Sequence, residues 1–143
     1  MADRLRVEKR RQVMSRVRAK DTRPERTVRS LAHQLGLRFR LHRSDLPGKP
    51  DLVFPRWRTI VLVHGCFWHQ HYGCPKCTVP QTNAEFWTAK LTRNVERDVR
   101  TKAELERLGW SVAVIWECET RRPDHLRSRL EDIFPQHHGP QSA

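Results

Sequence analysis

Residues 61–77 gather most of the side chains in this sequence that could bind a metal ion. This segment contains three of the four cysteines and three of the eight histidines. Thiols clustered with imidazole in a polar loop are the ligands that Zn²⁺ prefers. The candidate ligands are Cys66, His71, Cys74, Cys77 and the distant Cys118. Their spacing indicates a structural zinc site and leaves open which cysteine is not a ligand.

A second group of residues has the composition of a hydrolytic centre. Asp51 lies at the expected start of one strand and His64 at the end of the next, so a hairpin would bring them together. A carboxylate there can bind Mg²⁺ with a backbone carbonyl and a substrate phosphate. His64 or His69 can take a proton from water, because imidazole titrates near neutral pH. Asp98 or Glu96 could orient that histidine.

Three aromatic residues lie close to this chemistry in the sequence. Phe67 and Trp68 belong to the cysteine-rich loop, and Trp87 lies near the start of a predicted helix. Aromatic rings surrounded by Arg and Lys can wedge between base pairs, and each stacked base contributes roughly 1–3 kcal/mol. The alternative role is to cover the zinc site.

The chain of 143 residues is strongly basic, with 28 Lys and Arg against 16 Asp and Glu and a net charge of +12. Such a charge favours a polyanionic partner, of which nucleic acid is the first candidate. No apolar run is long enough to span a membrane. The N-terminus lacks the apolar core of a signal peptide, which predicts a cytoplasmic protein with reduced cysteines.

This length corresponds to about one domain. We expect a basic N-terminal arm over residues 1–20, a single domain over 21–135 and a disordered tail over 136–143. The arm either orders on phosphates or serves only solubility.

Helices are expected around three start signals. Thr22 to Glu25 forms a capping box that opens a helix ending at Gly36, and Glu25 either caps this helix or belongs to the site. A second capping box at 82–85 opens a helical region to about Leu108, with a break at Asn94 left open. Its inner face is expected to carry Phe86, Leu91, Val95 and Val99, and its outer face Lys90, Arg93, Arg97 and Arg100. Pro123 opens a last helix with Leu126, Leu130 and Ile133 inward.

Strands are expected over 37–41, 50–54, 59–63 and 111–116. The short turn at 55–58 allows only an antiparallel hairpin between the second and third, which places Asp51 beside Val63 and His64. The strands at 59–63 and 111–116 read as buried. The elements predict an α/β or α+β fold with a mixed central sheet flanked by helices.

Several strings resemble the very short patch repair (Vsr) DNA mismatch endonucleases, over about residues 10–134. They include His-Gly-Cys-Phe-Trp-His, a highly specific string, and occupy residues 46–53, 64–69, 86–87, 94–98 and 109–118, with Met14 ahead of Asp21 and Thr22. The resemblance implies a restriction-endonuclease-like fold with a structural zinc loop. It also implies Mg²⁺-dependent nicking of duplex DNA 5′ of a thymine mispaired with guanine, a lesion left by 5-methylcytosine deamination.

The resemblance further implies a role for each site residue. The magnesium ligands would be Asp51 and the backbone carbonyl of Val63. The catalytic network would comprise His69 as general base or acid, assisted by His64, Asp98 and Glu25. The structural zinc would be held by Cys66, His71, Cys74 and Cys118. The intercalating residues would be Phe67, Trp68 and Trp87, with Met14 entering from the opposite groove.

The sequence departs from the family pattern in three places. Val63 stands where relatives can carry a hydroxyl residue, and the gap after His71 is one residue longer, with Cys77 as an extra thiol. The acid-x-lysine pair usual in restriction nucleases is replaced by residues 63–65, as in Vsr enzymes. The expected partners are T·G-mismatched duplex DNA and mismatch-repair proteins, met by a nucleoid-associated monomer. The competing functions are a Vsr-like nicking or restriction-type nuclease with another target and a non-catalytic, zinc-stabilised DNA-binding module.

Overall fold

The computed structural model describes residues 22–75 and 78–135. The predictions for the arm at 1–20, for Met14, for Cys77 and for the tail at 136–143 fall outside the described residues.

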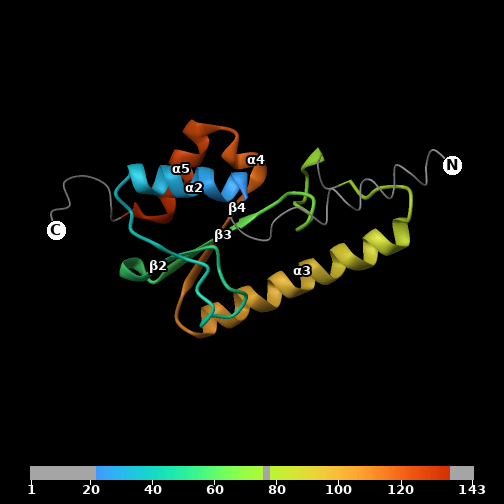
Figure 1. The fold of residues 1–143 in the computed structure, drawn as a ribbon, viewed down its shortest axis with the longest axis horizontal. Helices are drawn as coiled ribbons and strands as arrows, with labels where there is room; N and C mark the ends of the chain where they lie inside the picture. The colour runs from blue at the N-terminus through green and yellow to red at the C-terminus, as the bar shows by residue number, and fades with distance from the viewer. Residues whose placement is uncertain (1–21, 76–77, 136–143) are drawn as a thin grey trace.

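A four-stranded mixed sheet forms the centre of the molecule, in the order β1-β2-β3-β4 (Figure 1). Its strands are β1 (Arg40–Leu41), β2 (Leu52–Phe54), β3 (Thr59–His64) and β4 (Ser111–Trp116). β1, β2 and β3 pair antiparallel, whereas β3 and β4 pair parallel. The predicted hairpin is therefore confirmed, and its turn is the short 3₁₀ helix η1 (Pro55–Trp57).

Helices cover both faces of the sheet, which confirms the predicted α/β architecture. One face carries α2 (Arg23–Gln34), α4 (Glu117–Thr120) and α5 (Pro123–Ile133), and α3 (Ala84–Arg107) lies on the other side (Figure 1). No helix of the described residues is long and apolar enough to cross a membrane.

Alternating side chains of the strands build a separate core on each face. On the α2 and α5 side, Leu52, Phe54 and Val61 are fully buried and pack with helical residues such as Val28 and Leu130. On the α3 side the buried cluster consists of Val53, Ile60, Leu62, Leu105 and Trp110. Both cores meet at β2 and β3, so these two strands form the rigid support for the residues that follow them.

Helix α2 begins where the sequence predicts. The Thr22 side chain accepts a hydrogen bond from the Glu25 N–H at 3.3 Å, with proline in the first turn. The helix ends at Gln34, shortly before Gly36 in the left-handed region. Glu25 is only 2% exposed, and a carboxylate so deeply buried needs a partner beyond the helix.

Helix α3 differs from the prediction at its start and in its middle. Its N-cap is Asn83, with a left-handed backbone (φ 59°) and no capping hydrogen bond from its side chain, so the predicted capping box is wrong. The helix also continues through Asn94. The Asn94 side chain donates to the Trp68 carbonyl at 3.1 Å and thereby fastens the loop to the helix.

The inner face of α3 is also not the one predicted from its apolar residues. Phe86, Val95 and Val99 are exposed, Val99 to 65%. Apart from Lys90, the buried and half-buried positions instead follow one helical stripe of alternating four- and three-residue steps: Trp87, Leu91, Asn94, Asp98, Thr101 and Leu105. The middle of the stripe is polar because it faces the loop and the candidate site, a distinction that hydrophobic periodicity cannot make.

Two strands differ from the prediction, one in its length and the other in its burial. The strand expected over 37–41 is reduced to Arg40–Leu41, since the Leu37 N–H bonds to the Ala32 carbonyl of α2 at 2.9 Å. β4 lies at the edge of the sheet and is mostly half-buried rather than fully buried. The last helix matches its prediction, with Leu126 and Leu130 buried.

Candidate active site

Asp51 immediately precedes β2 and lies beside the end of β3, as the hairpin predicted. Its Oδ2 accepts a hydrogen bond from the Val63 N–H at 2.8 Å. The pKa of Asp51 rises from 3.8 to about 6, chiefly because the carboxyl is buried; the Val63 hydrogen bond opposes this rise and the nearby Glu25 contributes to it. A desolvated carboxylate of this kind is stabilised by a cation.

His42 lies with Glu25 and Asp51 in one group of possible metal ligands, and it was missed in the sequence. Its Nε2 lies 2.5 Å from Oε1 of the buried Glu25. One ligand atom from each of Glu25, His42 and Asp51 lies within 4.8 Å of the others. The only signal in the sequence is that His42 follows a strand predicted near Asp51; its left-handed backbone (φ 46°) has no sequence signature.

The two predicted histidines lie together, and His69 is near Asp51. His64 ends β3 and His69 lies in the loop that follows, and their rings stack with centroids 3.9 Å apart and planes 7° apart. The His69 Nδ1 lies 2.5 Å from Oδ2 of Asp98 on α3. Of the two acids considered, Asp98 is therefore the histidine partner, and Glu96 points to the exposed side of the helix.

The electrostatics separate the roles of these two rings. The pKa of His64 falls from 6.5 to about 4, chiefly because the ring is buried and in smaller part because His69 is its neighbour. His64 is consequently neutral at pH 7. His69 has its Nδ1 bonded to a carboxylate, which leaves Nε2 as the nitrogen that can exchange a proton. His69 is also close enough to Asp51 for its charge to lower the Asp51 pKa.

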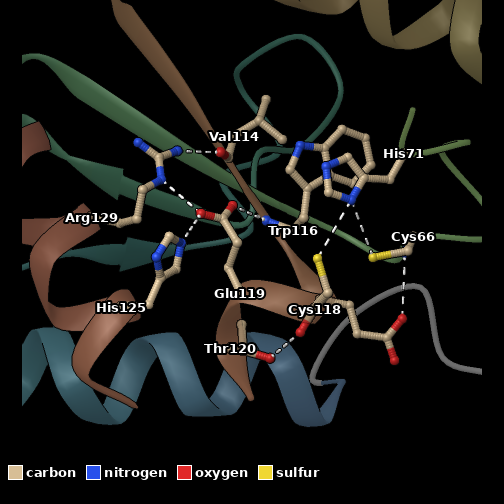
Figure 2. Close-up of polar contacts among 10 residues, drawn as sticks. Cys66, His71, Val114, Trp116, Cys118, Glu119, Thr120, His125 and Arg129 are labelled. Carbon is tan, nitrogen blue, oxygen red and sulfur yellow. Dashed lines mark hydrogen bonds and ion pairs between the residues drawn. The ribbon is translucent and has the colours of Figure 1, made fainter. Parts of the chain in front are cut away.

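The predicted zinc ligands also come together, from the loop and from α4. One ligand atom from each of Cys66, His71, Cys74 and Cys118 lies within 4.8 Å of the others. The Sγ atoms of Cys66 and Cys118 lie 3.6 and 3.5 Å from the His71 Nδ1 (Figure 2). Three thiols and one imidazole in this arrangement fit a closed tetrahedral zinc site.

The surroundings orient these ligands. The His71 ring stacks on Trp116 with centroids 4.2 Å apart, and the Cys66 N–H donates to Oε1 of Glu117. Glu119 accepts from the Trp116 N–H at 2.9 Å and also binds His125 and Arg129 (Figure 2). Burial raises the pKa of the Cys66 thiol to about 12, so a metal ion would be needed to hold it as a thiolate.

The predicted aromatic wedge forms one cluster between the loop and α3. The ring centroids of Phe67 and Trp68 lie 5.7 and 6.0 Å from that of Trp87. Phe67 and Trp68 are half-buried, whereas Trp87 is 3% exposed. The Lys90 Nζ lies 5.3 Å from the centre of the Trp68 ring. The loop aromatics are thus the accessible members of the cluster, next to a cation.

The sequence of this chain matches a family model and several known proteins. The family model described as DNA mismatch endonuclease Vsr matches residues 2–76. A Xanthomonas oryzae protein named Type II nicking enzyme V.XorIIP is 51% identical over 94% of this chain and 98% of its own. The Escherichia coli DNA mismatch endonuclease Vsr is 41% identical over 83% of this chain and 79% of its own.

Among solved structures, the fold is similar to the catalytic domain of the homing endonuclease I-Bth0305I. That likeness has a TM-score of 0.54 at 18% sequence identity and covers 83% of this chain and all of the other. It supports the fold alone. The matches in sequence, taken with the site described above, identify a DNA nuclease, and the chain belongs to the Vsr DNA mismatch endonuclease family.

Proposed function

We propose that this protein nicks duplex DNA on the 5′ side of the thymine in T·G mispairs, the lesion left when 5-methylcytosine deaminates. The observation that carries the proposal is the placement of a buried Asp51 beside a stacked His64–His69 pair whose outer ring is bonded to Asp98. The relative from Escherichia coli, named a mismatch endonuclease, favours the mispair as substrate.

Asp51 and the backbone carbonyl of Val63 would hold a catalytic Mg²⁺. The oxygen ligands and the desolvated carboxylate fit a hard divalent cation, which commonly binds only one or two protein carboxylates. The bound ion would supply charge stabilisation at the scissile phosphate and acidify water. The Val63 N–H holds one carboxylate oxygen of Asp51 in place for this task.

His69 would take the proton from the attacking water. Its Nδ1 is bonded to Asp98, which sets the tautomer and leaves Nε2 basic. His64, neutral because of its lowered pKa, stacks on His69 and holds the plane of the ring without adding a competing charge. Glu25 would assist from α2, where it is bonded to His42.

The remaining groups would shape the contact with DNA. Cys66, His71, Cys74 and Cys118 would hold a structural Zn²⁺, which stabilises a loop that has few apolar residues. Phe67 and Trp68, placed on that loop, would enter the base stack beside the mispair, with Met14 from the arm. The basic side chains of α3 would contact phosphates; they are Lys90, Arg93, Arg97 and Arg100.

A second candidate is site-specific nicking of a different target. It is favoured by the names of the relatives from Xanthomonas oryzae and Neisseria meningitidis, both called type II nicking enzymes. Mapping the cut position in products from several mispairs and flanking sequences separates the two candidates.

The direct test uses end-labelled duplexes that differ only in carrying T·G or T·A at one position. We expect one nick, 5′ of the mispaired thymine, that requires Mg²⁺ and is lost in Asp51→Ala. Equal cutting of both duplexes would contradict the mismatch specificity, and activity retained in Asp51→Ala would contradict the mechanism. Binding with a steep salt dependence but without any strand cleavage would indicate a DNA-binding module instead.

A further inference from the structure

We propose that His42 is a positioning residue of this active site, holding the Glu25 carboxylate at Asp51 and thereby setting the affinity of the pocket for its divalent ion. The inference rests on the proposed function, since it concerns the metal pocket of that reaction.

His42 connects the two segments that carry the acids. Its side chain contacts Glu25 on α2 through the 2.5 Å Nε2–Oε1 bond. Its backbone N–H donates to the Asp51 carbonyl at 3.3 Å, ahead of β2. One residue therefore joins the helix and the strand whose carboxylates share the pocket, and no ladder pair of the sheet includes Asp51 itself.

The burial of Glu25 explains why such a connection is needed. Its side chain is 2% exposed, and one of its carboxylate oxygens lies within 4.8 Å of an Asp51 oxygen, so the two acids repel each other at short range when both are ionised. A hydrogen-bond donor at Oε1 of Glu25 stabilises the ionised carboxylate and holds it next to Asp51. His42 is such a donor in the tautomer that carries its proton on Nε2.

The backbone of His42 is consistent with a functional demand at this position. Its φ of 46° places a non-glycine residue in the left-handed region, which costs of order 1 kcal/mol or more and persists only where the surroundings require it. In this conformation His42 makes one hydrogen bond from its backbone and one from its side chain.

The test measures Mn²⁺ affinity of the full, zinc-loaded protein without DNA, by electron paramagnetic resonance, in three variants. His42→Ala removes the contact with Glu25. His42→Gln keeps a donor of similar reach. His33→Ala is the control, because His33 is an exposed histidine on α2, the same helix that carries Glu25. Thermal unfolding of each variant shows whether it folds.

We expect His42→Ala to weaken Mn²⁺ binding by about 10- to 100-fold, the range typical for residues that orient metal ligands. His42→Gln should recover affinity to within a few-fold of the wild type, and His33→Ala should not change it. The Mg²⁺ concentration that half-saturates nicking should likewise rise in His42→Ala and return towards the wild-type value in His42→Gln, with a smaller change in kcat.

Three results would overturn the inference: a wild-type protein that does not bind Mn²⁺ in this pocket, His42→Ala affinity within twofold of wild type, or His42→Gln as defective as His42→Ala. If His42→Ala does not fold, His42→Asn replaces it, since asparagine tolerates the left-handed backbone but is too short to reach Glu25. The proposed function fails separately, when wild-type protein binds Mn²⁺ yet does not nick mismatched DNA.

Discussion

The imidazole rings of His64 and His69 lie face to face, with centroids 3.9 Å apart and an angle of 7° between their planes. Two protonated rings at this separation would repel each other, and the pKa of His64 is lowered to about 4 by burial and by His69. The stack therefore pairs His64, which stays neutral, with His69, whose Nε2 can exchange a proton. Asp98 establishes this difference because it binds the Nδ1 of His69.

This arrangement predicts how acid affects stability. A histidine whose pKa falls from 6.5 in the unfolded chain to about 4 in the fold stabilises the protein above pH 6.5, and this contribution is lost as the pH falls towards 4. The difference in unfolding free energy between wild type and His64→Asn should shrink by up to about 3 kcal/mol between pH 7 and pH 4. Urea unfolding at several pH values measures it. A pH-independent difference would show that His64 is not held neutral.

The stability contribution of Asp51 changes with pH in the opposite direction. Its pKa rises from 3.8 to about 6 in the fold, so the folded state pays an increasing cost as the pH rises through this interval. Asp51→Asn keeps an acceptor for the Val63 N–H and removes the charge. Without divalent ions it should be more stable than wild type at pH 7, by about 1–3 kcal/mol, while nicking is abolished. Lower stability of Asp51→Asn in urea would contradict the assigned desolvation.

The proton-transfer network predicts unequal effects of two acids on one helix. Asp98→Asn removes the carboxylate at the His69 Nδ1, whereas Glu96→Gln changes an exposed residue two positions away. Loss of a general base costs about 10²- to 10⁴-fold in rate, so His69→Ala should fall in this range. Asp98→Asn should lie between His69→Ala and wild type, and Glu96→Gln should match wild type. Single-turnover nicking rates provide the comparison; equal effects of the two acid substitutions would remove Asp98 from the network.

The sequence predicted the parts of the site that depend on local rules. The short turn at 55–58 determines the pairing of β2 and β3, and this pairing brings Asp51 to Val63 and His64. The spacing of cysteine and histidine likewise indicated the cluster of Cys66, His71 and Cys74 that, with Cys118, could hold a metal ion. These features follow from chain connectivity and ligand chemistry over short distances.

Other features depend on tertiary contacts that have no local signal. The position of His42 requires a left-handed backbone and a partner 17 residues earlier in the chain, neither of which is visible as a pattern. The inner face of α3 was misassigned because Asn94 and Asp98 look like surface residues until the loop packs over them. Polar positions facing a site cannot be told from polar positions facing water.

The aromatic cluster predicts a division between packing and DNA contact. Trp87 is 3% exposed, so Trp87→Ala should cost about 3–5 kcal/mol of stability through the cavity that it leaves. Phe67 and Trp68 are half-buried, and their alanine variants should lose less stability but more discrimination between mismatched and paired DNA. Binding titrations with both duplexes, alongside thermal unfolding, measure the two effects. Equal loss of affinity for both duplexes would mean that the loop aromatics serve packing only.

The proposed zinc site gives a prediction about which cysteines are needed to hold the ion. The thiol of Cys74 lies with those of Cys66 and Cys118 around His71, so Cys74→Ala should lose the bound metal and lower the melting temperature. Cys77→Ala is the matched control, three residues along the same loop, and should keep one zinc per chain. Metal content by atomic absorption, with melting curves before and after chelation, tests both. If Cys74→Ala kept zinc and Cys77→Ala lost it, Cys77 would be the ligand in place of Cys74. A tetrahedral site that already has His71, Cys66 and Cys118 accepts only one more ligand.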